Sequence, residues 1–486
     1  MSYKSLGDFI AASGEAGDLK IIHGADLDLD VGCLTELAYE ADGPMLLFDR
    51  FKGFADDFKV VTNVFRNSIR RYSLALGFPM DAHPVELVKM LRERRRIQKM
   101  IPPVEVADGP VLENSMKGSE VDVDKFPVPK WHAGDGGRYI GTGDLVIVRD
   151  PETGWVNFGT YRACVQSRDR VSLWINKHKH GRIIAEKYWS RGSTCPVAVV
   201  VGCDPLTFMA STTRTKYEYA GALHGSPVEV VKGPYTSLPI PAHAEIVLEG
   251  EIPSPQDESA AEGPFGEWPG YYSHTGQECV VRVKQIVYRR APTLFGDPPM
   301  RPLLSWGGDL PATGAEMWDH LERSGITDVT GVWGHCRGLM MVISLKQRYA
   351  GHAMQALFAA NGLKGSRSMS AFFVAVDDDI DPSNFRDVLW AICTRADPGS
   401  SVEILKSVWT EDLDPRLTPT QKETGAYTAG RMLIDACKPF HWREAFPKTN
   451  MFSLEDRQKV KQRWAKLVEE MANARPAIHG GRTSEE

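Results

Sequence analysis

The sequence lacks an apolar run long enough to cross a membrane. Its longest run, Ala371 to Val376, stops at Asp377 and falls far short of the roughly 20 residues that a membrane helix requires. The first ten residues include Asp8 and lack the apolar core of a signal peptide. We therefore expect a soluble protein of the cytoplasm, neither embedded in a membrane nor secreted.

Paired cysteines and an excess of positive charge are also missing. The eight cysteines contain no Cys-x-x-Cys pair and follow no regular spacing, so we expect reduced thiols. With 57 Lys and Arg against 63 Asp and Glu, the formal net charge is −6, and the chain as a whole is not attracted to a phosphate backbone. This balance argues against a nucleic-acid partner.

No tract dominated by Pro, Gly or Ser is long enough to indicate disorder. Hydrophobic residues make up 42% and charged residues 25% of the 486 residues, as in an average globular protein. A chain of this length exceeds one ordinary domain of roughly 100–200 residues, so we expect two or three domains.

The expected elements change along the chain from mixed to strand-rich and back to mixed. Residues 4–100 alternate helical and strand patterns, and prolines then interrupt residues 101–137, which we interpret as a linker or a domain crossing. Residues 138–292 are rich in β-branched segments, and beyond 320 helices and strands alternate again. The predicted helices are Leu6–Ser13, Arg182–Trp189, Tyr217–Leu223, Ala350–Asn361, Pro382–Arg395 and Leu454–Met471, and the predicted strands include Leu46–Phe48, Lys59–Val61, Asp144–Arg149, Val197–Val201, Val228–Val231, Glu245–Gly250, Val280–Val287, Leu339–Leu345 and Phe372–Val376.

Two of the helical segments carry predictions of their own. Asp381 is expected to cap the helix that starts at Pro382, because the missing N–H of a proline costs nothing at the first helical position. A basic cluster lies in a helix-like segment, where it is either a solvated helix face or a docking patch for an anionic group. Its members are Arg92, Arg94, Arg95, Arg96 and Lys99.

A glycine-rich stretch at residues 134–143 precedes the strand expected at Asp144–Arg149. A dinucleotide-binding fingerprint would follow a strand and open a helix, so this stretch is not one. It is either a tight turn at the strand entry or a backbone contact to a ligand.

Three further segments carry side chains that suit ligand binding. Asn157 and Arg162, five positions apart, could serve as a neutral oxygen ligand and a two-donor clamp for a carboxylate. His178 and His180, two apart on an expected strand, would face one side and could share a metal ion. Glu218 is either a carboxylate favoured by the dipole at a helix start or a metal ligand.

Two carboxylates bracket a rigid turn, Glu262-Gly-Pro-Phe-Gly-Glu267. The turn leaves the backbone little freedom and so presents both side chains in a defined way. A shared environment can hold one of two carboxylates ionised and the other protonated, which suits acid–base catalysis. A solvent-exposed acidic turn would have the same sequence.

Taken in order, these motifs resemble the UbiD family of reversible decarboxylases. The series runs through Asn157-x4-Arg162, His180, Glu218 in Glu-Tyr-Ala-Gly, and Glu262-Gly-Pro-Phe-Gly-Glu267, and continues through Lys346–His352, Asp377–Asp381 and Trp390–Pro398. The resemblance covers residues 5–460 approximately. Each motif is short, but their common order and approximate spacing are specific.

The resemblance implies a catalytic group and its chemistry. Arg162 would orient the substrate carboxylate, Glu262 would hold Arg162, and Glu267 would deliver a proton. Removal of CO2 from an sp2 carbon requires an electron sink that side chains cannot provide, and the prenylated flavin of the family supplies it. The expected activity is that of a carboxy-lyase acting on an aromatic, heteroaromatic or α,β-unsaturated acid.

The resemblance also implies prenylated FMN, a divalent metal ion, typically Mn2+, and a nearby K+. The metal ion would bridge to the flavin phosphate through an amide, an imidazole and a carboxylate, a donor set that suits a hard divalent ion. The metal ligands would be Asn157, His180 and Glu218. The residues that contact the cofactor would be these three together with Arg162, Lys179 and Lys364.

The architecture that the resemblance implies has three parts. An N-terminal α/β unit would span residues 1–115, a flavin-reductase-like split β-barrel 116–315, and a C-terminal α/β domain that forms homodimers or homohexamers 316–486. A flavin prenyltransferase would supply the cofactor. Two other functions stay open: a metal-dependent hydrolase built on Asn157, His180 and Glu218, which leaves Arg162 unused, and a non-catalytic flavin-binding assembly protein.

Overall fold

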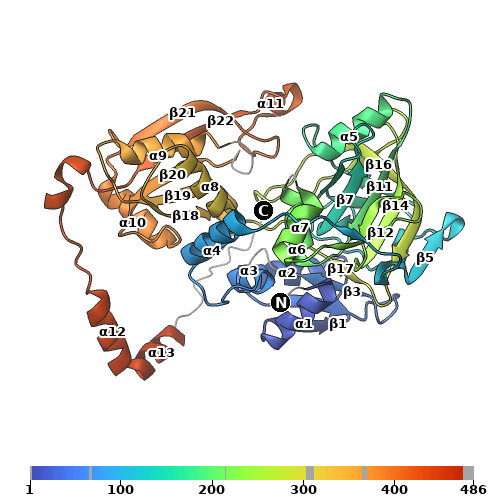
Figure 1. Ribbon diagram of the computed structural model, residues 1–486, viewed down its shortest axis with the longest axis horizontal. Coiled ribbons are helices and arrows are strands. Elements are labelled where there is room, and N and C mark those ends of the chain that lie inside the picture. The colour runs from blue at the N-terminus through green and yellow to red at the C-terminus, as the bar shows by residue number, and fades with distance from the viewer. Residues whose placement is uncertain (1–2, 65–67, 214, 303–310, 364–368, 474–486) are drawn as a thin grey trace. The chain divides into compact units, whose positions relative to one another are not determined.

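The structure, a computed structural model, describes residues 3–64, 68–213, 215–302, 311–363 and 369–473 (Figure 1). Two compact units follow one another along the chain, Met1–Cys437 and Lys438–Glu486. In the described residues, the first unit carries four β-sheets with helices packed on them. The mixed α/β fold class expected from the sequence is therefore confirmed.

The chain begins with a small α/β layer. Its elements are α1 (Leu6–Glu15), β1 (Leu19–His23), α2 (Asp30–Glu40), β2 (Met45–Asp49), β3 (Lys59–Thr62), α3 (Ile69–Leu76), α4 (Pro84–Ile97) and β17 (Thr293–Phe295). Ser5 and Asp8 form a capping box at the start of α1, which satisfies two backbone N–H groups reciprocally. The sheet order is β1-β2-β3-β17, so β17 returns from far along the sequence to pair with β3 in parallel.

The largest sheet curls into a half-barrel (Figure 1). Its strands are β5 (Asn114–Lys117), β6 (Tyr139–Gly141), β7 (Asp144–Arg149), β8 (Val156–Gly159), β9 (Ala163–Ser167), β10 (Arg170–Leu173), β11 (Cys195–Val201), β14 (Ile246–Ile252), β15 (Ser259–Glu262) and β16 (Gly276–Tyr288). The order β6-β9-β10-β16-β14-β11-β7-β8 places β16 in the middle, where it also pairs with β5 and β15. Residues 197–201 are all buried, which explains a continuous β-branched run in place of an alternating pattern. The half-barrel corresponds to the split β-barrel that the resemblance implied.

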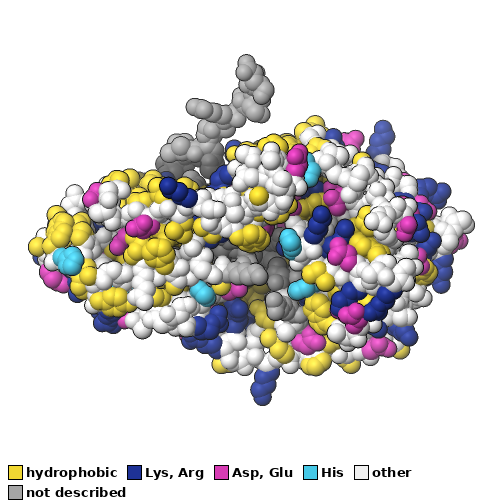
Figure 2. Space-filling model, turned by 90° about the horizontal axis from the view of Figure 1, so that it is seen from above, with side chains coloured by type: hydrophobic (Ala, Val, Ile, Leu, Met, Phe, Trp, Pro, Cys, Tyr) yellow, Lys and Arg dark blue, Asp and Glu magenta, His cyan; other side chains and the backbone are white. Residues whose placement is uncertain are grey.

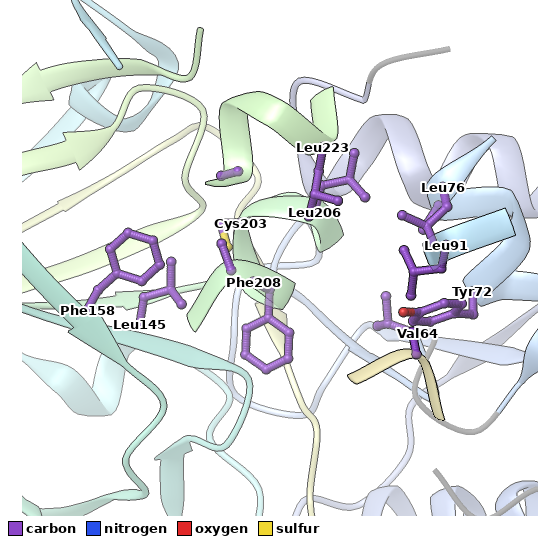
Figure 3. Packing of buried hydrophobic residues seen from close by; sticks show 14 of the residues in the cluster. Val64, Tyr72, Leu76, Leu91, Leu145, Phe158, Cys203, Leu206, Phe208 and Leu223 are labelled. Carbon is purple, nitrogen blue, oxygen red and sulfur yellow. The ribbon is translucent and has the colours of Figure 1, made fainter. Parts of the chain in front are cut away.

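Helices and a small sheet pack against the half-barrel. They are β4 (Val104–Glu105), α5 (His180–Trp189), α6 (Pro205–Met209), α7 (Lys216–His224), β12 (Glu229–Lys232) and β13 (Pro239–Pro241). One hydrophobic cluster joins the half-barrel to α6 and α7 and continues to α3 and α4 (Figure 3). Phe158 and Leu145 lie at its half-barrel end, and Tyr72 and Leu91 lie toward the N-terminal layer. The strand that carries Asn157 is thus fixed by core packing on one side.

The C-terminal part of the first unit is a mixed five-stranded sheet with the order β18-β19-β20-β22-β21. Its elements are α8 (Pro311–Arg323), β18 (Val329–His335), β19 (Met340–Leu345), α9 (His352–Asn361), β20 (Phe372–Asp377), α10 (Phe385–Arg395), β21 (Val402–Trp409), α11 (Pro419–Thr424) and β22 (Thr428–Asp435). The inner strands β19, β20 and β22 run parallel, whereas both edge strands run antiparallel to their neighbours. Helix α8 packs on α4 and β18, and α9 packs on β20 and β22.

The predicted start of α10 is wrong. The helix begins at Phe385 rather than Pro382, and Asn384 is its N-cap. Asp381 instead accepts hydrogen bonds from the Ser383 backbone nitrogen at 2.9 Å and from the Ser383 hydroxyl at 2.7 Å. The carboxylate therefore stabilises a turn that precedes the helix, a role for which aspartate is as well suited as for capping.

The basic cluster of α4 is partly buried. Arg92 is 6% exposed and pairs with Asp319 of α8 at 2.8 Å. Arg96 pairs with Glu322 of the same helix at 2.7 Å. Neither a fully solvated face nor a patch for an external anion describes this arrangement, because α4 uses part of its charge to pack on α8.

The second unit contains the helical segment predicted at the C-terminal end. The single helix expected over Leu454–Met471 is instead two helices, α12 (Leu454–Arg463) and α13 (Ala465–Asn473). The break falls at Trp464, whose backbone leaves the helical region with φ −117° and ψ 32°. Both helices are largely exposed within this unit.

The cysteines, the apolar character of the helices and the surface charges relate to the expectations drawn from composition. All eight cysteines lie in the described part of the chain as free thiols, as expected. Among the described residues, no helix combines the length and the apolar character needed to span a membrane. On the face shown in Figure 2, Lys and Arg side chains are interspersed with Asp and Glu side chains.

Candidate active site

Arg162 holds two carboxylates that lie 100 and 105 positions away in the sequence. Arg162 directly precedes β9, Glu262 ends β15, and Glu267 lies in the loop that follows. The guanidinium donates from Nε to Glu262 Oε1 at 2.7 Å and from Nη2 to Glu262 Oε2 at 2.6 Å. Its Nη1 pairs with Glu267 Oε1. The planar group can bind one carboxylate with two donors and a second with the third, which an ammonium could not do. The structure thus brings together the three residues that the resemblance assigned to catalysis.

Aromatic side chains enclose this cluster. The side chains of Arg162 and Glu262 are only 6% and 1% exposed. The Tyr139 hydroxyl donates to Glu262 Oε1 at 2.8 Å, and the guanidinium carbon lies 4.9 Å from the Trp174 ring centroid and 5.4 Å from that of Phe265. Rings above a guanidinium attract the cation and exclude water, and the low local dielectric strengthens the ion pairs.

Burial and neighbouring charges shift the pKa values of Glu267 and Arg162. Burial raises the pKa of Glu267 above the ordinary value, and the opposing charge of Arg162 does not cancel this effect. Burial alone would lower the pKa of Arg162, but Glu262 and Glu267 outweigh it and the pKa of the guanidinium is raised. Arg162 is therefore a permanent cation, whereas Glu267 retains a proton more readily than an exposed glutamate. A carboxyl group of this kind suits general acid catalysis.

The glycine-rich stretch found in the sequence packs against the loop between the two carboxylates. The Gly136 nitrogen donates to the Pro264 carbonyl at 2.7 Å, and a β-carbon on Gly136 would lie 2.2 Å from the Gly263 carbonyl oxygen. Asp135 accepts a hydrogen bond from the Gly266 nitrogen at 3.0 Å. Of the two interpretations, the tight turn agrees with these contacts, because only a residue without a side chain permits such a close approach.

A third carboxylate, Glu278 of β16, lies beside the cluster, and the sequence analysis missed it. The strand register pairs Glu262 with Gly276 and Ala260 with Glu278, so the two glutamates are diagonal neighbours on one face. A β-carbon on Gly276 would lie 3.1 Å from Glu278 Oε1, which shows that this side chain extends over the glycine. Burial, and then the charge of Glu262, raise the pKa of Glu278 to about 7. No local motif marks it, since its position depends on strand pairing.

The three residues assigned to the metal ion belong to elements that meet. Helices α5 and α7 both pack on β8, and they carry His180 and Glu218, whereas Asn157 lies on β8 itself. Phe158 and Tyr217, the chain neighbours of Asn157 and Glu218, pack edge to face with ring centroids 4.7 Å apart. Asn157 is 1% exposed and Glu218 is partly exposed.

The two histidines do not lie on a strand. The chain leaves β10 at Leu173, passes through a turn, and starts α5 at His180. The His180 ring packs edge to face on Trp155, with centroids 5.2 Å apart. The expectation that His178 and His180 face one side rested on the period of a strand and is wrong, because His178 lies in the turn.

Two lysines lie close together near this site. Of the two lysines predicted to contact the cofactor, Lys179 is the N-cap residue of α5, and Lys364 lies outside the described residues. Lys216, which the sequence analysis did not identify, is buried at the start of α7 and donates to the Ser211 carbonyl at 2.9 Å. Burial, and then the charge of Lys179, lower the pKa of Lys216 to about 8. Two ammonium groups that repel each other create a local potential that favours an anion.

The residues around Asn157 fit a hard divalent ion. The side-chain nitrogen of Asn157 is buried and makes no hydrogen bond of ordinary geometry with the described residues, although it lies beside the Tyr161 hydroxyl. Amide, imidazole and carboxylate donors without thiolate suit Mn2+ or Mg2+. Within the described ranges, no three His, Cys, Asp or Glu side chains converge as a metal cluster, so an ion here would depend on the asparagine oxygen.

Comparison with known proteins identifies the family. Residues 10–91, 103–302 and 310–436 match, in turn, the N-terminal, Rift-related and C-terminal domains of 3-octaprenyl-4-hydroxybenzoate carboxy-lyase, UbiD. The chain belongs to the UbiD family. The family resemblance deduced from the order of the motifs is thus confirmed, and with it the expected carboxy-lyase activity.

Solved structures of UbiD-class enzymes are similar over nearly the whole chain. Vanillic acid decarboxylase of Sedimentibacter hydroxybenzoicus, in its open form, is 27% identical over 98% of this chain and 100% of its own, with a TM-score of 0.82. HmfF of Pelotomaculum thermopropionicum, in complex with FMN, is 30% identical over 93% of this chain and 98% of its own, with a TM-score of 0.81. An evolved dimeric form of HmfF in complex with prFMN is 28% identical over the same shares, with a TM-score of 0.77. None of these similarities supports the hydrolase or the assembly protein.

Proposed function

We propose that this UbiD-family enzyme removes CO2 from an aromatic, heteroaromatic or α,β-unsaturated carboxylic acid with prenylated FMN as its cofactor. The observation that carries the proposal is the buried cluster of Arg162 between Glu262 and Glu267, in which burial raises the pKa of Glu267. The complexes of HmfF with FMN and prFMN support the flavin. A bound prenylated flavin supplies the electron sink for cleavage of the bond to CO2, which no side chain offers.

Each residue of the cluster then has a separate part in the reaction. Arg162 attracts the substrate carboxylate and orients it, because its positive charge is permanent and its donors lie in one plane. Glu262 binds two of those donors and so fixes the plane of the guanidinium. Glu267 holds a proton and gives it to the carbon that has lost CO2. Trp174 and Phe265 keep water from the guanidinium.

A second group of residues holds the cofactor. A divalent ion, Mn2+ by the family resemblance, would be held by an amide, an imidazole and a carboxylate, with K+ nearby and lysines toward the flavin phosphate. Asn157 is buried beside the Tyr161 hydroxyl, and its side-chain oxygen is the neutral donor that such an ion would take. The residues are Asn157, His180 and Glu218 for the ion, with Arg162, Lys179 and Lys364 as further cofactor contacts.

The proposal also covers the domain boundaries, the oligomeric state, the cellular location and the supply of the cofactor. Domain boundaries near residues 115 and 315, a homodimer or homohexamer in the cytoplasm, and a flavin prenyltransferase as cofactor supplier are consistent with this function. The three family matches, over residues 10–91, 103–302 and 310–436, support a division into three parts, with their ends somewhat before these boundaries. The dimeric form of HmfF supports assembly.

The test is co-expression with a flavin prenyltransferase, followed by absorbance spectroscopy of the purified protein and a screen of aromatic and α,β-unsaturated acids. We expect a bound modified flavin, CO2 release, and deuterium exchange into the decarboxylated product in buffered D2O. Chelator-sensitive hydrolysis without bound flavin would favour the metal-dependent hydrolase. Bound flavin without turnover of any acid would favour the assembly protein.

A further inference from the structure

Tyr161 lies between the two groups of residues that form the proposed site. It directly precedes Arg162 of the catalytic cluster and follows the end of β8 by two positions. Its side chain is 8% exposed. The ring contacts two glycines from different elements, Gly159 and Gly181, and each contact explains why that position carries no side chain.

The first contact is with the strand that carries Asn157. A β-carbon on Gly159 would lie 2.7 Å from the Tyr161 hydroxyl oxygen and 2.8 Å from ring atom Cζ, so the ring lies directly over the glycine. Alternate residues of a strand face the same side, which places Asn157 and Gly159 on one face of β8. The tyrosine therefore covers the strand position next to the Asn157 amide.

The second contact is with the start of α5. The Gly181 N–H donates to the Tyr161 hydroxyl at 3.3 Å, and a β-carbon on Gly181 would lie 2.9 Å from ring atom Cε2. Among the described residues, no side chain caps this helix from Lys179, so the hydroxyl satisfies one of the N–H groups that a helix start leaves free. Gly181 is the direct neighbour of His180, whose ring packs on Trp155.

We propose that Tyr161 is a positioning residue that sets the spacing between Asn157 on β8 and His180 on α5 and keeps the two in register for one divalent ion. The inference rests on the proposed function in so far as that ion accompanies the flavin. The rigid ring fixes the separation of strand and helix, and the hydroxyl fixes the rotation of the first helical turn. Arg162 of the catalytic cluster is the next residue in the chain.

The alternative is that Tyr161 only fills the core, since its ring belongs to a large buried cluster. A core-filling residue contributes to the free energy of unfolding and to nothing else. A positioning residue also changes the metal dependence of cofactor binding. The two roles therefore predict different effects of Mn2+ on FMN affinity, which thermal unfolding does not measure.

The test compares FMN binding to flavin-free, full-length protein in Mn2+ and in EDTA. Tyr161→Phe keeps the ring and removes the hydroxyl. We expect the gain in FMN affinity that Mn2+ gives to fall about three- to tenfold, the effect of one lost hydrogen bond, with FMN affinity in EDTA unchanged. Gly181→Ala keeps the tyrosine but adds a methyl group that displaces its ring, so it should reduce the gain in FMN affinity as well. It replaces Tyr161→Phe if that variant does not fold.

Tyr3→Phe is the matched control. Tyr3 is 5% exposed and its hydroxyl donates to the Leu74 carbonyl at 3.3 Å, so this variant also loses one buried hydroxyl contact, in the N-terminal layer. It should lower the melting temperature and leave the Mn2+ effect at the wild-type value. A wild-type Mn2+ effect in both Tyr161→Phe and Gly181→Ala would overturn the inference, as would an equal loss in Tyr3→Phe. Wild-type protein that binds FMN equally with and without Mn2+ would overturn the ion site itself.

Discussion

At the scale of single residues, Arg162 contacts two glutamates in different ways. Glu262 receives two donors of Arg162 and the Tyr139 hydroxyl, so its charge is well compensated. Glu267 pairs with the guanidinium and with the Trp268 backbone, yet burial raises its pKa. Glu267 therefore meets the condition for a proton donor, whereas Glu262 makes the contacts that position the guanidinium.

Glu267→Gln should separate proton delivery from binding. The amide keeps the shape of the side chain and can still accept a hydrogen bond from Arg162, but it cannot give up a proton. We expect turnover to fall at least about 100-fold with little change in KM. CO2 release and deuterium incorporation into the product measure the loss. Full activity in this variant would refute the assigned acid.

Arg162→Lys should have a different effect from Glu267→Gln. An ammonium cannot reproduce the planar donors, so the substrate carboxylate is misplaced and KM should rise together with a fall in kcat. Glu262→Gln should resemble Arg162→Lys, because its proposed part is to fix the guanidinium plane. Steady-state kinetics of the three variants on one substrate provide the comparison. A Glu262→Gln variant that loses only kcat would contradict the division of roles.

Glu278 should make stability depend on pH near neutrality. Its pKa is about 7 against an ordinary 4.5, raised by burial and by the facing charge of Glu262, while Arg162, Arg182 and Asp412 also face it. Because the folded pKa is raised, the stabilising effect of the protonated form is complete below the ordinary pKa and is lost as the pH rises through 7.

The variant Glu278→Gln stays neutral at every pH. It should melt near the wild-type temperature at pH 5 and a few degrees higher than wild type at pH 8, with partial exposure limiting the difference. Differential scanning calorimetry at both values measures it. Glu93→Gln, at an exposed position of α4, is the control and should change neither. Equal melting temperatures of wild type and Glu278→Gln at pH 8 would contradict the raised pKa.

At the scale of elements, local patterns predicted most strands and helices, and failures occurred where the same residues suit two local structures. The strand β7 matches its predicted range, Asp144–Arg149. The start of α10 failed because Asp381 suits a turn as well as a cap. The histidine pair failed because a strand period was assumed where the chain turns into α5. Each error concerns a choice between local structures that the same residues can form.

Site residues that belong to the family motifs could be predicted from the sequence. Residues that reach the site only through strand pairing could not. The order of the family motifs along the chain was enough to predict Arg162, Glu262 and Glu267 as one group. Glu278 joins them only through the pairing of β15 with β16, and Tyr161 is defined by glycines on β8 and α5. Such contacts depend on register between distant segments, and no local propensity encodes that register.

The proposed ion connects β8, α5 and α7 to the cofactor, so its loss should act on the flavin. Asn157→Ala and Glu218→Ala should each lower metal affinity by at least about tenfold and reduce the flavin that remains bound after purification. Metal analysis and flavin absorbance measure both quantities in one preparation. Glu93→Ala is the control. Normal metal and flavin contents in both variants would remove these residues from the ion site.

At the scale of the molecule, one hydrophobic cluster spans the N-terminal layer, the half-barrel and the C-terminal sheet. Together with β17, which returns to the N-terminal sheet, it explains why residues up to Cys437 form one compact unit. The sequence predicted three consecutive parts but not their interleaving, because a strand of three residues such as β17 has too little pattern to show which sheet it joins.

The second unit presents apolar side chains that its own helices leave exposed. Leu467 and Met471, four positions apart on one side of α13, are 46% and 60% exposed, and Trp464 at the break before this helix is 54% exposed. Helices of this length are marginal in water without a packing partner. A second copy of the chain is the partner that the proposed assembly provides.

We therefore expect the full-length protein to be at least a dimer by light scattering at micromolar concentration. Replacing Leu467 and Met471 together by Glu should shift the mass toward that of one chain, because two carboxylates cannot be buried in an apolar contact without large cost. The melting temperature of the first unit should not change. Lys466→Glu alters charge on the same helix outside this pair and should leave the assembly intact. A wild-type monomer at this concentration would contradict the prediction, and an unchanged assembly in the double variant would show that other surfaces hold the subunits together.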